Sequence, residues 1–189
     1  MKKTLILLAH PHMDQSRLNK TLLEAIKDES DITVHDLYAN YTSIHDIDVK
    51  KEQALLLSHD RIVFQFPLYW FSTPGLLKDW QDKVLEYGFA YGSEGYKLEG
   101  KEFKIVVTVG SPEYAYQTGA YVQASMSEIL KPLQTMVIFT QMIFTQPFAV
   151  HRALKITDEE LHDKAQEYKN LLAKKDWSTS LFKYLADEK

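Results

Sequence analysis

Residues 4–19, TLILLAHPHMDQSRLN, decide the fold of this chain. They begin with a continuous apolar run, Thr4–Ala9, which is typical of a strand buried on both faces of a parallel sheet. A polar segment, His10–Gln15, follows it. Ser16 then has the side chain of a helix cap, and the helix after it has one apolar face, made of Leu18, Leu22, Leu23 and Ile26. A buried strand that leads directly into an amphipathic helix is the first half of a βαβ unit.

The same alternation continues along the rest of the chain. Further strands are expected at Ile32–Leu37, Arg61–Phe66, Phe103–Val109 and around Phe144–Val150. Helices are expected at 51–58, 74–86, 119–136 with a kink at Pro132, and 157–173, and the segment 176–189 is expected to be a short docking helix or a frayed end. Five strands with intervening helices predict one α/β domain over residues 1–189, with a doubly wound parallel sheet.

Composition excludes several classes of protein. The chain has no cysteine, so disulfides, thiolate catalysis and cysteine metal sites are ruled out. Its net charge of −4, with basic and acidic residues interspersed, is unlike the one-sided basic surface of a nucleic-acid binder. No apolar run approaches the roughly 20 residues of a membrane helix, and the run before His10 is too short for a signal peptide. We therefore expect a cytoplasmic protein whose redox chemistry would come from a bound cofactor.

Ligands of doubly wound sheets bind at the carboxyl ends of the strands, which selects the loop after the first strand. This loop opens a helix, so free backbone N–H groups and the positive end of the helix dipole are available to a phosphate. In this loop Ser16 and Asn19 add neutral donors, and Arg17 adds a positive charge. A plain capped helix is the alternative. His10 and His12 lack a third nearby ligand, so no metal site is expected.

The loop after the third strand contains three consecutive aromatic residues between two prolines. Apolar residues in a loop leave exposed surface unless something covers them. A flat ring would cover them by stacking, and backbone amides of the loop could bind its edge. The candidate residues are Pro67, Leu68, Tyr69, Trp70 and Phe71. The alternative, compatible with the first, is that these aromatics belong to the core or to a subunit interface.

The loop after the fourth strand provides a close approach of the backbone. The candidate residues are Thr108, Val109, Gly110, Ser111 and Pro112. Gly110 would let the main chain reach a ligand, and amides here would stabilise negative charge on a ring. An ordinary strand-to-helix turn is the alternative. Together the three loops predict a phosphate site, a stacking platform and an amide cradle at one sheet edge, which is the layout that FMN needs.

The chain resembles the NAD(P)H:quinone oxidoreductases of flavodoxin-like fold, especially short bacterial members such as potassium-efflux ancillary oxidoreductases and general stress proteins. The motifs that carry the resemblance are residues 5–11, the pair Ser16 and Asn19, and residues 66–74, 77–80, 88–92 and 147–151. The likeness extends from residue 3 to about 173. It implies a three-layer sandwich around a five-stranded parallel sheet of order 2-1-3-4-5.

The resemblance also implies an activity and roles for individual residues. FMN is implied rather than FAD, with NAD(P)H as co-substrate and two-electron, ping-pong hydride transfer to a quinone-like or other flat acceptor. His10 and Leu18 are implied to surround the phosphate together with Ser16, Arg17 and Asn19. Phe89 and Tyr91 are implied to roof the ring across a homodimer interface, and Tyr116 and Tyr121 are implied as catalytic residues. One departure is Pro112, which stands in a turn that is usually rich in glycine and which lacks an N–H donor.

Two other functions remain open at this stage. The resemblance allows a regulatory ancillary subunit of a glutathione-gated potassium efflux system, which would place the chain at the inner face of a membrane through its partner. An electron-transfer flavodoxin is the other, but a net charge of −4 with 22 basic residues does not supply the strongly acidic surface of such proteins.

Overall fold

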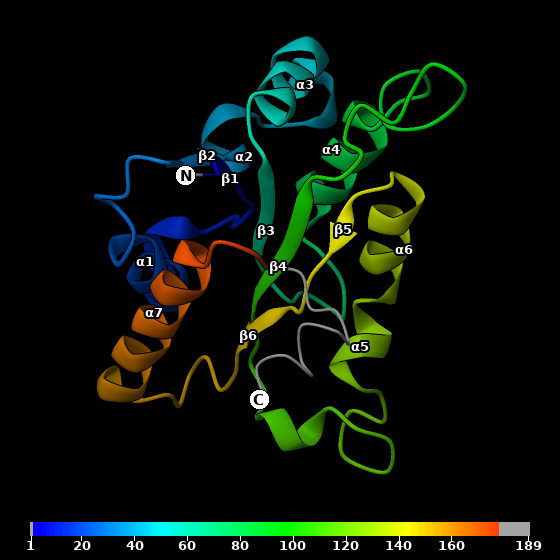
Figure 1. Ribbon diagram of the computed structural model, residues 1–189. Helices are drawn as coiled ribbons and strands as arrows, with labels where there is room; N and C mark the ends of the chain where they lie inside the picture. The colour runs from blue at the N-terminus through cyan, green and yellow to red at the C-terminus, as the bar shows by residue number, and fades with distance from the viewer. Residues whose placement is uncertain (1, 178–189) are drawn as a thin grey trace, which may run out of the picture.

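A computed structural model of the protein describes residues 2–177 and contains one parallel sheet (Figure 1). Its strands are β1 Thr4–Leu8, β2 Ile32–Asp36, β3 Arg61–Pro67, β4 Glu102–Thr108, β5 Ile143–Phe144 and β6 Phe148–Val150. The strand order is β2-β1-β3-β4-β5, and β6 also pairs with β4. The predicted order 2-1-3-4-5 is therefore confirmed.

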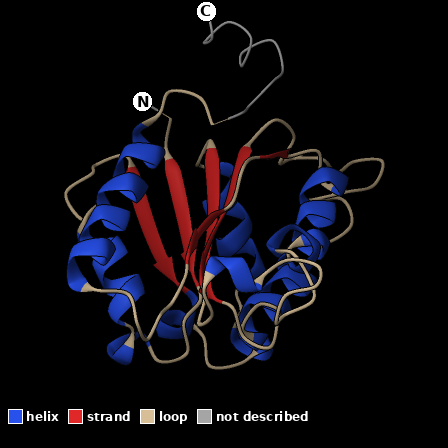
Figure 2. Cartoon of the chain, turned by 90° about the horizontal axis from the view of Figure 1, so that it is seen from below, coloured by secondary structure: helices blue, strands red, loops and turns tan. Residues whose placement is uncertain are grey.

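Helices cover both faces of the sheet (Figure 2). They are α1 Arg17–Glu24, α2 Leu37–Asn40, α3 Val49–Leu57, α4 Gly75–Val84, α5 Met126–Ile129, α6 Lys131–Phe139 and α7 Asp158–Ala173, with 3₁₀ turns at Met13–Gln15, Ile44–Asp46 and Glu113–Ala115. The apolar side chains of α1 and α7 form one buried cluster, and those of α3, α4 and α6 contribute to the other. The three-layer sandwich is confirmed. No helix among residues 2–177 is both long enough and apolar enough to cross a membrane.

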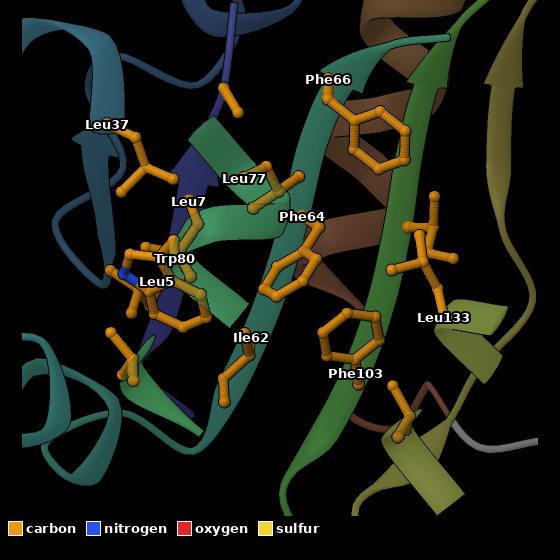
Figure 3. Close-up of a cluster of buried hydrophobic side chains, with 14 of the residues drawn as sticks. Leu5, Leu7, Leu37, Ile62, Phe64, Phe66, Leu77, Trp80, Phe103 and Leu133 are labelled. Carbon is orange, nitrogen blue, oxygen red and sulfur yellow. The ribbon is translucent and has the colours of Figure 1, made fainter. Parts of the chain in front are cut away.

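Period-two alternation along the strands assigns each side chain to a layer. Leu5 and Leu7 of β1 and Phe64 of β3 lie in the cluster that faces α3 and α4, where Phe64 packs edge-on against Trp80 with ring centroids 5.7 Å apart (Figure 3). Ile6 belongs to the opposite cluster, against α1 and α7. The continuous apolar runs are thus explained by burial on both faces, as expected for parallel strands.

The predicted fifth strand is split. β5 pairs with the start of β4, at Glu102 and Phe103, and β6 pairs with its end, from Val106 to Thr108. Between them Thr145 still donates its N–H to the Phe103 carbonyl at 2.9 Å, but Pro147 has no N–H to continue a ladder. The prediction of one strand over residues 144–150 was therefore wrong in its continuity.

The predicted helix over residues 119–136 begins later than expected. Residues 119–125 form turns, with Gly119 at φ +83 and Gln123 at φ +62. Ser125 caps α5 and forms a capping box with Glu128, a signal that the sequence carries at this position. Pro132 stands in the first turn of α6 rather than kinking a helix, because that position needs no N–H donor. The docking helix expected at 176–189 falls mainly on residues 178–189, which lie outside the described residues.

A buried carboxylate ties four segments together beneath the α3–α4 layer. Glu52 is fully buried, and its oxygens accept hydrogen bonds from Tyr41 Oη at 2.6 Å and Trp80 Nε1 at 2.8 Å and lie 2.8 Å from His35 Nε2. Burial by itself would raise the pKa of Glu52, but these hydrogen bonds outweigh it and hold the pKa below its ordinary value.

This carboxylate makes stability depend on pH. Because its folded-state pKa is lowered, its contribution is fully present above its unfolded pKa of about 4.3 and is lost as pH falls through the folded pKa. We expect a Glu52→Gln variant to lose roughly 3 kcal/mol at pH 7 and to show a shallower decline between pH 5 and 2. Urea unfolding of the wild type and the variant between pH 5 and 2 measures the free energy of unfolding at each pH. Parallel plots of this free energy against pH would contradict the role given to Glu52.

Candidate active site

The three loops selected from the sequence meet at the carboxyl edge of the sheet. The Leu68 N–H, in the loop after β3, donates to the Thr108 carbonyl at the end of β4 at 2.9 Å. Asn19, in α1, reaches the Thr108 hydroxyl at 3.2 Å. The rings of His10 and Tyr69 lie edge to face with centroids 6.4 Å apart. The ends of β1, β3 and β4 therefore form one continuous surface.

The first loop offers backbone donors at the start of α1. Ser16 caps the helix by accepting the Asn19 N–H at 3.3 Å, and the N–H groups of Arg17 and Leu18 have no acceptor among residues 2–177. The Leu18 side chain is buried in the core, and that of Arg17 donates to the Ile156 carbonyl and lies 3.7 Å from Asp158. The backbone of these two residues, rather than their side chains, is therefore available to an anion.

His10, in the same loop, is a buried and neutral hydrogen-bond donor. Burial lowers the pKa of His10, and the nearby His12 lowers it further. The His10 Nδ1 atom accepts the His12 N–H at 3.1 Å. The neutral ring must therefore carry its proton on Nε2, which leaves one N–H for hydrogen bonding.

Asn19 is turned into the protein and not toward a ligand. Only 1% of it is exposed, and its Nδ2 group donates to Ser16 Oγ at 3.1 Å and to Thr108 Oγ1 at 3.2 Å. Its Oδ1 atom accepts from Gln65 Nε2 at 3.1 Å. These internal bonds occupy its amide group, so contact of Asn19 with a phosphate stays a prediction.

The second loop is a tight hairpin that holds two aromatic residues in a strained conformation. Tyr69 and Ser72 exchange both backbone hydrogen bonds at 3.0 Å, and Trp70 and Phe71 between them have φ values of +47 and +62. Positive φ at both central residues is the type I′ turn, which favours Asn and Gly. Each left-handed aromatic residue costs about 1–3 kcal/mol. Trp70 is 93% exposed, so packing among residues 2–177 does little to offset the cost at this residue.

The flanking residues of this loop are anchored. Pro67 is the last residue of β3 and is buried, and Leu68 is half-buried against the large hydrophobic cluster. Tyr69 and Phe71 are 40% and 51% exposed. The loop therefore presents an aromatic surface on a fixed base.

The third loop leaves an open place at Gly110. Val109 is buried and donates its N–H to the Val150 carbonyl at 2.8 Å, whereas a Cβ atom built on Gly110 would meet nothing within 4 Å. The Ser111 carbonyl lies 3.2 Å from His151 Nδ1, and Pro112 precedes the Glu113–Ala115 turn. The backbone at position 110 is therefore open on the side where a side chain would lie.

The two tyrosines expected to be catalytic lie in different settings. The half-buried Tyr116 packs against His151 with ring centroids 5.5 Å apart, beside the third loop. Tyr121 is 90% exposed in the turns before α5. The structure therefore associates Tyr116, together with His151, with the candidate site and leaves Tyr121 in solvent.

A cavity of about 450 Å³ adjoins the aromatic loop between α4 and α6. Phe71 and Tyr91 both line it, and Tyr91 packs against Phe139 with centroids 5.5 Å apart. Phe89 is only 4% exposed and lies in the core of its own chain, so its role as a roof residue stays a prediction. Phe139, which is 60% exposed, was not singled out from the sequence.

Gln65 and Tyr168 are buried polar residues that sequence reasoning also missed. The Tyr168 hydroxyl donates to Gln65 Oε1 at 2.9 Å, and Gln65 in turn donates to Asn19. The available signal was one glutamine inside the otherwise apolar residues 62–67 of β3, IVFQFP. A buried glutamine requires hydrogen-bond partners, so its presence pointed to an internal polar network.

Comparison with known proteins agrees with this geometry. A family model described as flavodoxin-like fold matches residues 2–172. The NAD(P)H oxidoreductase YdeQ of Bacillus subtilis is 49% identical over 166 residues, covering 88% of this chain and 84% of YdeQ. KefG of Escherichia coli K12, a glutathione-regulated potassium-efflux system ancillary protein, is 42% identical over 171 residues, covering 90% of this chain and 92% of KefG.

Two solved structures extend the likeness to three dimensions. General stress protein 14 of Treponema denticola, in complex with FMN, is 40% identical with a TM-score of 0.85, covering 90% of this chain and 97% of that one. An NADPH-quinone reductase from P. pentosaceus is 37% identical with a TM-score of 0.83, covering 92% and 99%. This chain therefore belongs to the flavodoxin-like family that includes these NAD(P)H oxidoreductases.

Proposed function

We propose that this chain binds FMN at the carboxyl edge of its sheet and is an NAD(P)H:quinone oxidoreductase. The observation that carries the proposal is the Trp70–Phe71 turn, in which two exposed aromatic residues are held at positive φ at the same sheet edge as the open Gly110. Backbone strain without internal compensation is typical of ligand sites. The FMN complex of general stress protein 14 and the likeness to an NADPH-quinone reductase support the choice of ligand and reaction.

The residues present fit FMN at both of its ends. The phosphate would bind at the start of α1, since anions favour a helix N-terminus. Its hydrogen-bond donors would be the N–H groups of Arg17 and Leu18, the Ser16 hydroxyl and the His10 Nε2–H group. The aromatic turn and the backbone at Gly110 and Ser111 would hold the ring. When bound, FMN supplies a ring that takes a hydride from NAD(P)H and passes it to an acceptor.

The chain's own residues would orient the reactants and manage a proton. Tyr116, against His151, lies where a phenol O–H could donate to an acceptor oxygen that gains negative charge. Tyr91 and the exposed Phe139 form an aromatic wall that would cover a ring bound on a second copy of the chain. Such a wall selects flat acceptors and excludes water from the hydride path.

A second candidate function rests on the 42% identity with KefG across most of both chains. Under it, the chain would also bind a membrane potassium-efflux protein and increase its activity. Potassium efflux from vesicles that contain a glutathione-gated efflux protein, with and without added chain, tests it. An increase in efflux supports the second function, and unchanged efflux contradicts it.

Loss of the stacking surface should loosen FMN selectively. We expect Trp70→Ala to weaken FMN binding by roughly tenfold, because the indole would stack on the ring. The side chain of His12 is exposed, and the hydrogen bond from this residue to His10 uses the backbone N–H, so His12→Ala should change affinity by less than about twofold. Fluorescence quenching of FMN by each protein measures both constants, and equal retention in the two variants would count against the stacking platform.

The reaction itself is tested by NADH or NADPH oxidation with a benzoquinone acceptor. We expect turnover by the FMN-loaded protein and a proportional loss in Trp70→Ala at limiting FMN. FMN binding without turnover by any quinone would remove the reductase assignment while leaving the FMN site intact.

A further inference from the structure

A chain of buried polar side chains crosses the protein from α7 to the start of α1. Tyr168 is fully buried, and its hydroxyl donates to Gln65 Oε1 at 2.9 Å. Gln65 Nε2 donates to Asn19 Oδ1 at 3.1 Å, and Asn19 Nδ2 donates to Ser16 Oγ at 3.1 Å. Four side chains from three elements and a helix cap thus share one continuous hydrogen-bonded path. Buried polar groups are retained only when they are satisfied, and each link here is within bonding distance.

Tyr168 determines which group donates and which accepts in each hydrogen bond of the path. Burial raises the pKa of Tyr168, so its hydroxyl keeps its proton and donates to Gln65. Because Gln65 accepts through its oxygen, its NH₂ group is the one that faces Asn19. Asn19 therefore accepts from Gln65 and presents its own NH₂ group to Ser16.

Ser16, the last residue of the path, can only donate one further hydrogen bond. Ser16 Oγ accepts two hydrogen bonds from Asn19, from the backbone N at 3.3 Å and from Nδ2 at 3.1 Å. A hydroxyl oxygen has two lone pairs, so both are used and only the hydroxyl hydrogen remains. That hydrogen has no acceptor among the residues from 2 to 177, and Ser16 stands at the start of α1 beside the free N–H groups of Arg17 and Leu18.

We propose that Tyr168, Gln65 and Asn19 are positioning residues that hold the Ser16 hydroxyl as a hydrogen-bond donor to the phosphate group of FMN. This inference rests on the proposed function and assigns a role to residues that do not touch the ligand. A hydroxyl that can only donate favours an anion, which can only accept. The path therefore selects for the phosphate of FMN over the neutral ribityl end of riboflavin.

The test compares two ligands on one variant. Tyr168→Phe keeps the ring that stacks on Phe148, with centroids 5.7 Å apart, and removes only the hydroxyl. Without that donor both amides are free to reverse, and Ser16 can turn its proton inward to Asn19. We expect FMN to bind roughly fivefold to tenfold more weakly, about 1–1.4 kcal/mol, and riboflavin to bind within about twofold of wild type.

A matched control separates this effect from general destabilisation. Tyr41→Phe also removes a buried tyrosine hydroxyl, one that donates to Glu52 at 2.6 Å on the opposite side of the sheet. It should leave the ratio of FMN to riboflavin affinity unchanged. A similar fall in this ratio in both variants would overturn the inference.

A double-mutant cycle with Ser16→Ala supplies a second readout. If the path acts through Ser16, Tyr168→Phe has no further effect on FMN affinity in the Ser16→Ala background, so the two changes are not additive. Additive losses, or equal losses for FMN and riboflavin, would overturn the positioning role while leaving the FMN site in place. Failure of the wild-type protein to bind either ligand would instead remove the proposed function and this inference with it.

Discussion

Gly110→Leu is expected to fold as stably as the wild type and to lose FMN affinity by about 100-fold or more, close to 2.7 kcal/mol. Gly110 is exposed, its φ is not in the left-handed region, and an added Cβ meets nothing within 4 Å. The ligand-free chain therefore has room for a larger side chain. A flavin ring against this backbone would compete with the leucine for the same space. Thermal unfolding of the ligand-free proteins and FMN titration of each measure the two effects separately.

A graded series makes this test specific. Gly110→Ala adds one methyl group and should give a smaller loss of FMN affinity than leucine, with stability again unchanged. If the leucine variant binds FMN as tightly as wild type, the backbone at Gly110 does not approach the ring.

Replacing Trp70-Phe71 with Asn-Gly is expected to stabilise the ligand-free protein while it weakens FMN binding. Asn and Gly are the residues that a type I′ turn favours, so strain of about 1–3 kcal/mol per aromatic residue is relieved. The replacement also removes the buried part of the Phe71 side chain, which is 51% exposed and lines the cavity beside α6. A net gain of about 1–2 kcal/mol should raise Tm by roughly 2–8 °C.

Trp70→Phe is the matched control for this pair. It keeps an aromatic ring at the same positive φ, so both stability and FMN affinity should remain near those of wild type. A lower Tm for the Asn-Gly variant would show that the aromatic turn is held by internal packing rather than kept for a ligand.

Much of this architecture is readable from the sequence because burial on both faces leaves a plain signal. Each run such as Leu5–Leu8 is apolar at every position, since odd and even side chains enter different clusters. The three loops could be selected because parallel strands bring their carboxyl ends to one edge. Their contact is confirmed by the bonds from Leu68 and Asn19 to Thr108.

The direction of individual side chains could not be read in the same way. Asn19 has the residue type of a phosphate ligand, but its partner Gln65 lies 46 positions away and turns its amide inward. Phe89 belongs to a motif that implies a roof, but the Gly88 N–H bonds to the Tyr91 carbonyl at 2.8 Å, and this turn leaves Phe89 in the core. Such choices depend on long-range contacts that no local pattern contains.

The most direct test of the central claim is the visible absorption spectrum of the purified protein under nitrogen. It is recorded alone, after addition of FMN and removal of the excess, and then after addition of NADPH or NADH. We predict two flavin bands that remain with the protein after removal of free FMN and that bleach on addition of the reductant. A colourless protein that retains no added FMN would contradict the account.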